Sequence, residues 1–250
     1  MIAFITGATA GIGKSTAEIF AKNGYNLIIT GRRKDRLEAF SKLLKDTHKI
    51  DVLSLNFDVR NLKEVQEAVK SIPDNWKKIN VLVNNAGLAV GLNSIQEGVT
   101  DDWDRMIDTN IKGLLYMTRT LVPLMTANGF GHIVNLGSIA GKEVYANGNV
   151  YCATKHAVDA LSKSMRIDLL PHHIKVTAIH PGMVETEFSI VRFKGDEEKA
   201  KNVYKGVQPL TPDDIAETIY WTASRPSHVN INDVVIMPTV QASATTVLRN

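Results

Sequence analysis

The sequence predicts one α/β domain, residues 1–250, built on a parallel sheet with helices on both faces. Short β-branched runs alternate with longer amphipathic runs along the whole chain, and the short runs are almost wholly apolar. Such alternation produces a parallel sheet, and strands covered by helices on both sides lack polar residues. Of the 250 residues 44% are hydrophobic and 22% charged, which is enough apolar material for one large core.

The predicted elements follow one another in strict order. Strands are expected at residues 2–6, 25–30, 51–59, 79–87, 131–138, 174–182 and 233–239. Helices are expected at residues 14–24, 36–46, 62–72, 101–129, 149–170 and 211–224. Gly24 and Gly129 supply helix stops, and Thr211 with Pro212 supplies a helix start. The polar segment 183–206 interrupts the alternation and is long enough to form a lid over a site.

Charge and cysteine usage exclude several classes of protein. The net charge of +3 is too weak for a nucleic-acid-binding stripe. The single cysteine, Cys152, allows no internal disulfide and favours a reducing compartment. The N-terminus has no secretory pattern, and no apolar run is long enough to cross a membrane. We therefore expect a cytoplasmic protein that binds neither nucleic acid nor membrane.

A glycine-rich turn, TGATAGIG, follows the first strand and opens the first helix. In a parallel α/β sheet this turn lies at the carboxyl ends of the strands, where ligands bind. Glycines let the backbone approach a pyrophosphate, and the helix N-terminus supplies free N–H groups. The turn therefore predicts a nucleotide site, for which we select Gly7, Thr9, Gly11, Ile12 and Gly13.

Charge at the end of the second strand selects the nucleotide. An acidic residue there would bind the ribose of NAD, but the chain has Arg32 and Arg33 in the segment TGRRKDR. Guanidinium groups attract a 2′-phosphate, so we predict NADP(H), although Asp35 could neutralise part of the charge. After the third strand, Asp58 and Val59 are placed to meet the adenine, with a helix N-cap as the alternative for Asp58.

A tyrosine and a lysine four positions apart, Tyr151 and Lys155, lie on one face of a predicted helix. The ordinary pKa of tyrosine is about 10, and a nearby ammonium lowers it by favouring the phenolate. Ser138 lies at the carboxyl edge of the fifth strand, where its hydroxyl can hold a substrate oxygen. We expect these residues to exchange a proton with a carbonyl–alcohol pair while a nicotinamide moves hydride.

These motifs together resemble the short-chain dehydrogenases/reductases. The matching segments, in order and in register over nearly the whole chain, are TGATAGIG, NNAG, DTNIKG, Ser138, YCATK and HPG. The resemblance implies a doubly wound Rossmann-type sheet of seven strands, no metal, and a catalytic tetrad of Asn110, Ser138, Tyr151 and Lys155. Asn110 would kink the long helix and hold a water in a relay to Lys155. The resemblance also assigns cofactor contacts to Asn84, Ala86, Gly87, Tyr151, Lys155, Pro181, Gly182, Val184 and Thr186.

The lid and tail resemble the NADP-dependent 3-hydroxy acid dehydrogenases that also oxidise serine and allo-threonine, although the segment before TEFS is shorter than in bacterial members. This implies a small 3-hydroxy acid substrate held by Ser138, Tyr151 and Arg192, and a homotetramer. The alternative for Arg192 is a lid salt bridge to Glu185 or Asp196. Alternative functions are reduction of 3-oxoacyl thioesters or other ketones with NADPH, and a non-catalytic NADP-binding regulator.

Overall fold

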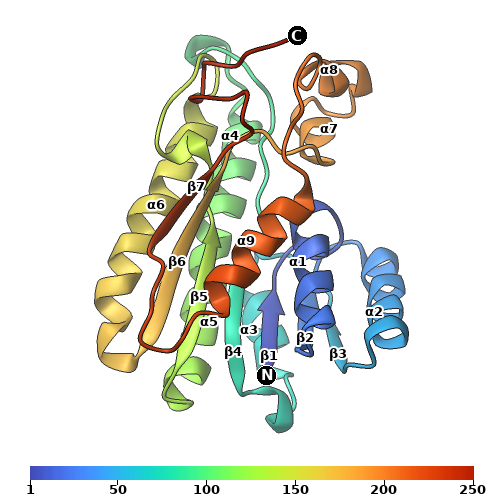
Figure 1. Cartoon of the computed structure of the whole chain (residues 1–250), viewed down its shortest axis with the longest axis vertical. Helices are drawn as coiled ribbons and strands as arrows, with labels where there is room; N and C mark the ends of the chain where they lie inside the picture. Colours follow the sequence, from blue (N-terminus) through green and yellow to red (C-terminus); the bar gives the residue numbers. More distant parts are fainter.

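All seven strands of the structure, a computed structural model that describes residues 1–250, are parallel and form one sheet in the order β3-β2-β1-β4-β5-β6-β7 (Figure 1). The strands are β1 (Ile2–Ile5), β2 (Asn26–Thr30), β3 (Val52–Leu55), β4 (Ile79–Asn84), β5 (Gly131–Leu136), β6 (Ile174–Pro181) and β7 (Asp233–Ile236). The strand order reverses direction between β1 and β4, which is where ligands bind in sheets of this kind. Because all strands are parallel, their carboxyl ends lie at one edge of the sheet. The predicted fold class is confirmed.

Nine helices flank the sheet or lie beyond its edge. They are α1 (Gly11–Lys22), α2 (Lys34–His48), α3 (Leu62–Lys70), α4 (Thr100–Ile107), α5 (Leu114–Ala127), α6 (Asn149–Leu169), α7 (Phe188–Arg192), α8 (Glu197–Asn202) and α9 (Pro212–Ala223). Helices α1, α2 and α9 cover one face, whereas α3, α5 and α6 cover the other. The start predicted at Thr211 is confirmed, because Thr211 and Asp214 form a capping box.

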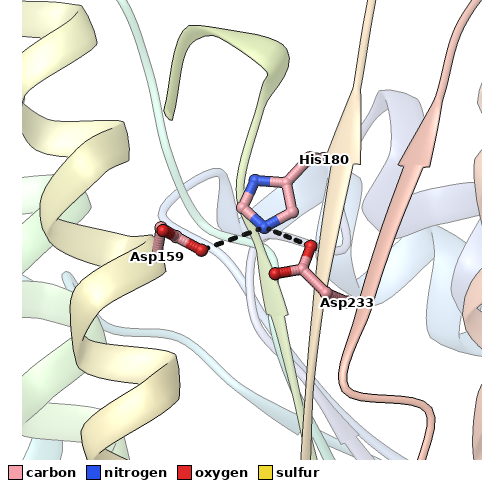
Figure 2. A group of neighbouring side chains, drawn as sticks. All are labelled: Asp159, His180 and Asp233. Carbon is pink, nitrogen blue, oxygen red and sulfur yellow. Dashed lines mark ion pairs between the residues drawn. The ribbon is translucent and has the colours of Figure 1, made fainter. Parts of the chain in front are cut away.

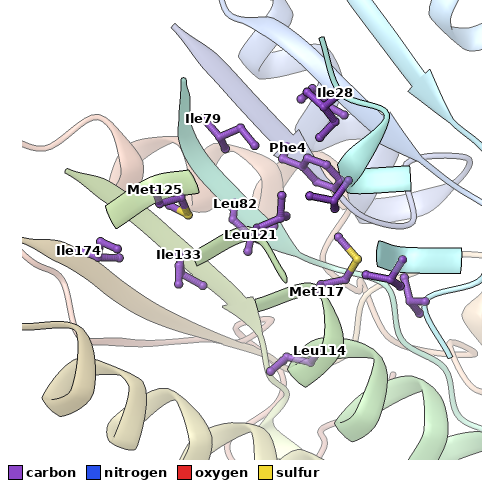
Figure 3. Packing of buried hydrophobic residues seen from close by; sticks show 14 of the residues in the cluster. Phe4, Ile28, Ile79, Leu82, Leu114, Met117, Leu121, Met125, Ile133 and Ile174 are labelled. Atoms are coloured by element: carbon purple, nitrogen blue, oxygen red, sulfur yellow. The ribbon is translucent and has the colours of Figure 1, made fainter. Parts of the chain in front are cut away.

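Each face of the sheet has its own core. In the core under α5, Phe4 and Leu82 from the central strands pack among Met117, Leu121 and Met125 (Figure 3). All of these side chains are at most 1% exposed. A large apolar residue transferred from water to such a position contributes about 1.5–3 kcal/mol, so burial fixes the layers that carry the site.

The long helix predicted over 101–129 is interrupted. Helix α4 ends at Ile107, and α5 begins at Leu114. Between them, Asp108–Gly113 forms a π-helical segment that contains Asn110. Wider turns of this kind occur mainly as short insertions at functional sites. Side-chain periodicity gives no sign of the interruption, because the apolar pattern continues through it.

The segment 183–206 contains two short helices, α7 and α8, beyond the carboxyl edge of the sheet. Residues of the C-terminal tail are bound to it and to its start. Gln241 Oε1 accepts a hydrogen bond from Met183 N at 2.8 Å, and Asn250 N donates to Gly206 O at 3.0 Å. None of the helices combines the length and the apolar character that crossing a membrane requires.

Candidate active site

The glycine-rich turn connects β1 to α1 at the carboxyl edge of the sheet. Gly7 has a φ of 68°, a conformation that glycine adopts without strain. A Cβ atom at Gly13 would overlap Gly7 O and the side chain of Asn85. Asn85 Nδ2 donates to Thr6 O at 2.8 Å and so fixes the turn from the β4 side. Helix α1 has no side-chain cap and no acid in its first turn, so its N–H groups are free for an anion.

Arg33 lies above this turn and contacts Thr9 and the lid. Its Nη2 donates to Thr9 Oγ1 at 3.1 Å, and its Nη1 lies 2.8 Å from Glu187 Oε2. Arg36 Nη1 contacts the same carboxylate at 3.0 Å. Hydrogen bonds from Arg33 lower the pKa of Glu187, which holds it ionised near neutrality. The arginine charge is thus neutralised by Glu187, and not by Asp35 as considered from the sequence.

Asp58 and Arg32 face each other across the ends of β2 and β3, with 3.7 Å between Arg32 Nη1 and Asp58 Oδ2. Burial opposes ionisation of Asp58, but hydrogen bonds from Arg60 lower its pKa overall. The alternative role of Asp58 as a helix N-cap is wrong, because Asn61 caps α3. Val59 is buried, 8% exposed, beside the π-helical segment.

The NNAG segment follows β4 at the same edge. Asn84 Nδ2 donates to Thr118 Oγ1 at 3.0 Å and to Asn135 Oδ1 at 2.9 Å, so it ties the central strand to α5 and β5. Ala86 and Gly87 continue beyond the strand, beside the glycine-rich turn and Asn110. Asn84 therefore supports the central strand, whereas the cofactor contacts of this segment stay predictions.

The end of β6 leads into the lid on the opposite side of the glycine-rich turn. Pro181 ends the strand and Gly182 follows it. Val184 and Thr186 come next, and a Cβ atom at Gly11 would lie 3.4 Å from Thr186. Thr186 therefore lies beside the glycine-rich turn, while the cofactor contacts of Pro181, Gly182, Val184 and Thr186 stay predictions.

Tyr151 of α6 and Ser138 of the loop after β5 lie close together at the carboxyl edge of the sheet. Burial raises the pKa of Tyr151, while the Arg192 guanidinium and the Ser138 side chain act in the opposite direction. The prediction that Lys155 lowers the pKa of Tyr151 is therefore wrong. Lys155 Nζ lies 5.9 Å from the centre of the Tyr151 ring, and burial outweighs the nearby positive charge.

Lys155 and Asn110 complete the predicted tetrad. Lys155 is 6% exposed, its Nζ donates to Leu136 O at 2.8 Å, and burial lowers its pKa to about 8. Asn110 Oδ1 accepts from Leu88 N at 2.8 Å, and Nδ2 donates to Thr154 Oγ1 at 3.0 Å. The structure thus brings all four tetrad residues together at the carboxyl edge of the sheet, while their catalytic roles and the water relay stay predictions.

Arg192 reaches from α7 of the lid onto Tyr151. Its guanidinium carbon lies 4.9 Å from the Tyr151 ring centre and 5.1 Å from that of Phe188. Its Nη2 donates to Tyr145 Oη at 2.7 Å, and its buried Nε has no hydrogen-bond partner. Burial raises the pKa of Tyr145 to about 12, so this phenol stays neutral. A cation stacked on aromatic rings, with one donor unused, is ready to receive an anion.

The alternative for Arg192, a salt bridge within the lid, is not formed. Asp196 pairs with Lys199 at 3.1 Å, and Glu185 has no ion pair. Lys194, the other lid cation near the site, lies 2.8 Å from Asp102 Oδ2 on α4. Arg192 therefore has no carboxylate partner, and its contacts are with the aromatic side chains and Tyr145 Oη.

Beside Arg192 and Tyr151 lies a narrow cleft of about 310 Å³ including its mouth. Trp103 and Met106 of α4 border it from the other side. Sequence reasoning missed three residues of the region: Asn85, Tyr145 and Glu187. Asn85 lies within the segment NNAG and Glu187 within TEFS, so both were close to predicted residues. Tyr145 belongs to no motif and is recognised only from its contact with Arg192.

Comparison with known proteins agrees with this geometry. A family model described as short chain dehydrogenase matches residues 1–197. The chain is 50% identical over 245 residues to the NADP-dependent 3-hydroxy acid dehydrogenase YdfG of Salmonella typhi, covering 98% of this chain and 97% of that protein. It is 43% identical over 246 residues to the NADP-dependent 3-hydroxy acid dehydrogenase of Schizosaccharomyces pombe, covering 98% and 95%.

Among solved structures, the closed form of serine dehydrogenase complexed with NADP+ has a TM-score of 0.93 and 45% identity, with 100% of both chains covered. A 3-ketoacyl-ACP reductase from Sinorhizobium meliloti has a TM-score of 0.84 and 27% identity, covering 95% of this chain and 97% of that one. With its matching fold, motifs and relatives, the chain belongs to the short-chain dehydrogenase family.

Proposed function

We propose that this protein is an oxidoreductase that transfers hydride between NADP(H) and the alcohol or carbonyl group of a small 3-hydroxy acid. The relatives of 43–50% identity are named NADP-dependent 3-hydroxy acid dehydrogenases, and the similar serine dehydrogenase structure contains NADP+. The observation that carries the substrate class is Arg192, a cation without a carboxylate partner that contacts Tyr151.

The residues present fit NADP. Gly7 and Gly13 let the turn pack closely against Asn85 and against its own backbone, where a side chain would clash, and the uncapped N-terminus of α1 has free N–H groups for a pyrophosphate. Arg32 and Arg33 are half exposed at the end of β2, where they can meet a 2′-phosphate. When bound, the nicotinamide supplies the hydride acceptor or donor.

The tetrad would move the proton that accompanies the hydride. In alcohol oxidation the Tyr151 phenolate would accept the hydroxyl proton, and in carbonyl reduction the phenol would return it. Ser138 would hold the same substrate oxygen by hydrogen bond. The guanidinium of Arg192, 4.9 Å from the Tyr151 ring, would favour the phenolate, and a positively charged nicotinamide would add to this effect.

Arg192 would bind the substrate carboxylate through its unused donors. A planar guanidinium can grip a carboxylate at two points, which places C3 of the acid between the lid and Tyr151. Tyr145, which accepts from Nη2, would hold the guanidinium in this orientation.

A substrate panel tests the proposal. Purified protein is assayed with serine stereoisomers, 3-hydroxypropionate, 3-hydroxybutyrate and 3-oxoacyl thioesters, each with NADP(H) and NAD(H). We expect turnover of 3-hydroxy acids with NADP. Preferred reduction of thioesters would support the alternative reductase function, and cofactor binding without turnover of any substrate would support a regulator.

Arg192→Met tests the carboxylate contact with two substrates, a 3-hydroxy acid and its methyl ester. If Arg192 binds the carboxylate, kcat/KM falls by about tenfold to a hundredfold for the acid and changes little for the ester. Lys194→Met is the matched control, because it removes a lid cation that is paired with Asp102. Equal losses for acid and ester would show that Arg192 only closes the lid.

We also propose that the protein acts as a cytoplasmic homotetramer. Leu115 of α5 and Ile167 of α6 are 37% and 75% exposed, which suits helices that pack against another copy. Light scattering after gel filtration measures the mass directly. A monomeric mass would contradict the proposal, and Ile167→Glu should reduce the mass if this face is the contact.

A further inference from the structure

The loop that carries Ser138 is fixed at its first end by β6. Gly137 N donates to Ile179 O at 2.7 Å, and His180 Nδ1 lies 3.2 Å from Ser138 O. A carbonyl only accepts, so Nδ1 carries the hydrogen of this contact. His180 is wholly buried and leaves no room for a Cβ atom at Gly137. The backbone on both sides of Ser138 Cα is therefore held by β6.

The loop then turns onto helix α6. Residues Ile139–Gly141 form a 3₁₀ turn in which Ser138 Oγ accepts from Ala140 N at 3.1 Å. A Cβ atom at Gly141 would lie 2.5 Å from Lys155 O, which is a steric clash. The loop thus rests directly on the helix turn that carries the catalytic lysine, and the turn sets the direction of the serine hydroxyl.

Lys142 holds the second end of the loop. Its Nζ lies 2.7 Å from Asp159 Oδ1 and 2.8 Å from Asp233 Oδ2, and its side chain is 25% exposed. Asp159 is on α6, one turn after Lys155 and two turns after Tyr151. Asp233 begins β7. Lys142 therefore joins the Ser138 loop to the helix of the other catalytic residues and to the edge strand.

Asp159, His180 and Asp233 converge from α6, β6 and β7 behind the loop (Figure 2). His180 Nε2 lies 3.2 Å from Asp233 Oδ1 and 3.7 Å from Asp159 Oδ1. Such a group could hold a cation, but the Lys142 ammonium already bridges the two carboxylates. Lys142 therefore compensates the negative charge of Asp159 and Asp233. This identifies the three residues as a cluster that holds the loop, and not as a metal site.

We propose that Lys142, acting with Asp159, Asp233 and His180, is a positioning residue that fixes Ser138 relative to Tyr151. This role rests on the proposed dehydrogenase activity. Without the Lys142 ammonium, Asp233 loses its only lysine partner, and the loop loses its ion pair with Asp159 of α6. An error of about 1 Å in the placement of a catalytic group can cost a hundredfold in rate. Cofactor binding does not depend on this contact.

Lys163 provides a matched control, because it binds the same carboxylate from the solvent side. Its Nζ lies 2.6 Å from Asp159 Oδ2, its side chain is 56% exposed, and it does not touch the Ser138 loop. The experiment compares Lys142→Met with Lys163→Met in the full-length protein, after wild-type turnover of a 3-hydroxy acid has been established. Measurements are kcat, the Kd for NADPH by fluorescence, and amide hydrogen exchange over residues 137–142.

For Lys142→Met we expect kcat to fall by about tenfold to a hundredfold. The amides of Gly137, Ala140 and Gly141 should exchange faster, while Kd for NADPH stays within about twofold. Lys163→Met should leave all three quantities near wild type, and Lys142→Arg should restore kcat and protection. Equal kcat in the two methionine variants, or a fall in kcat without faster exchange of the loop, would overturn the proposal. An inactive wild type would instead contradict the proposed function.

Discussion

Ion pairs lie at both ends of the candidate active site, but they differ in exposure. At the end of β2, the side chains of Arg33, Arg36 and Glu187 are 42%, 55% and 48% exposed. Behind Ser138, those of Lys142 and Asp159 are 25% and 13% exposed. Exposed ion pairs contribute little to stability and exchange readily with solvent or ligand. Less exposed pairs are costly to break, because the remaining charge stays desolvated.

This difference corresponds to two tasks. The exposed arginines must release Glu187, at least in part, if they are to meet a phosphate. The less exposed cluster has no predicted ligand, and its contacts hold Ser138 against α6. We therefore predict that charge recognises a ligand at the first end and maintains geometry at the second, and that substitutions at the two ends differ in what they change.

The largest effect is expected from Tyr151→Phe at the catalytic end. The substitution removes the transferable proton and little contact area, so kcat should fall by about a hundredfold or more. The Kd for NADPH, measured by fluorescence, should stay near wild type. Retention of more than a few per cent of kcat would contradict the role of Tyr151 as proton donor.

The next effect concerns the free energy of unfolding. Burial lowers the pKa of Lys155 from 10.5 to about 8, so keeping this lysine charged at pH 7 costs about 3 kcal/mol, at about 1.4 kcal/mol per unit. Lys155→Met should therefore stabilise the protein by up to that amount at pH 7, although turnover is lost. Between pH 8 and 10.5 the unfolded chain binds more protons than the folded one, so the wild type gains stability.

Urea unfolding of Lys155→Met and wild type at pH 7 and pH 10 measures this gain. The difference in unfolding free energy should shrink at the higher pH. A variant that is less stable than the wild type at pH 7 would show that the bond to Leu136 outweighs the cost of burying the charge.

A smaller effect is expected at the exposed end from replacing both Arg32 and Arg33 by glutamine. A hydrogen bond to a charged group contributes about 1.5–3 kcal/mol, so the KM for NADP should rise by roughly tenfold to a hundredfold. The KM for NAD should change little. Lys34→Gln, which removes a neighbouring cation paired with Glu38, is the control. Equal losses with both cofactors would assign the arginines a structural role alone.

The smallest effect is expected from Glu187→Gln. The glutamine carries no charge, so it no longer competes for Arg33 or repels a 2′-phosphate. NADPH should therefore bind a few-fold more tightly, because an exposed ion pair contributes about 1 kcal/mol or less. The gain should disappear at high salt, because exposed charges are screened. Weaker NADPH binding in this variant would instead mean that Glu187 holds the arginines in position for the phosphate.

The sequence allowed the fold to be predicted because the layers depend on apolar patterning. The strands are nearly all apolar, and each lies within its predicted range. Helical periodicity alone predicted one continuous helix, and only the family resemblance indicated a kink at Asn110, where the structure has a π-helical segment. Its cause is in tertiary contacts, since Asn110 bonds the backbone of Leu88 in a distant loop.

The sequence motifs also predicted that the tetrad and the expected cofactor residues lie at one edge of the sheet, since the carboxyl ends of parallel strands meet there. Contacts between distant side chains could not be predicted in the same way. Lys142, Asp159 and Asp233 belong to a loop, a helix and a strand, and no spacing in the sequence relates them. The pKa of Tyr151 was predicted from one neighbouring charge, whereas the folded environment adds desolvation and Arg192.

The attachment of the tail to the lid has a consequence for synthesis on the ribosome. Gln241 and Asn250, which bind Met183 and Gly206, follow all seven strands in the chain. The sheet can therefore assemble from emerged segments while the lid still lacks these contacts. A nascent chain in which β7 has just left the ribosome should hold a formed sheet beneath a lid that still lacks these contacts, so the sheet and the lid are completed at different moments of translation.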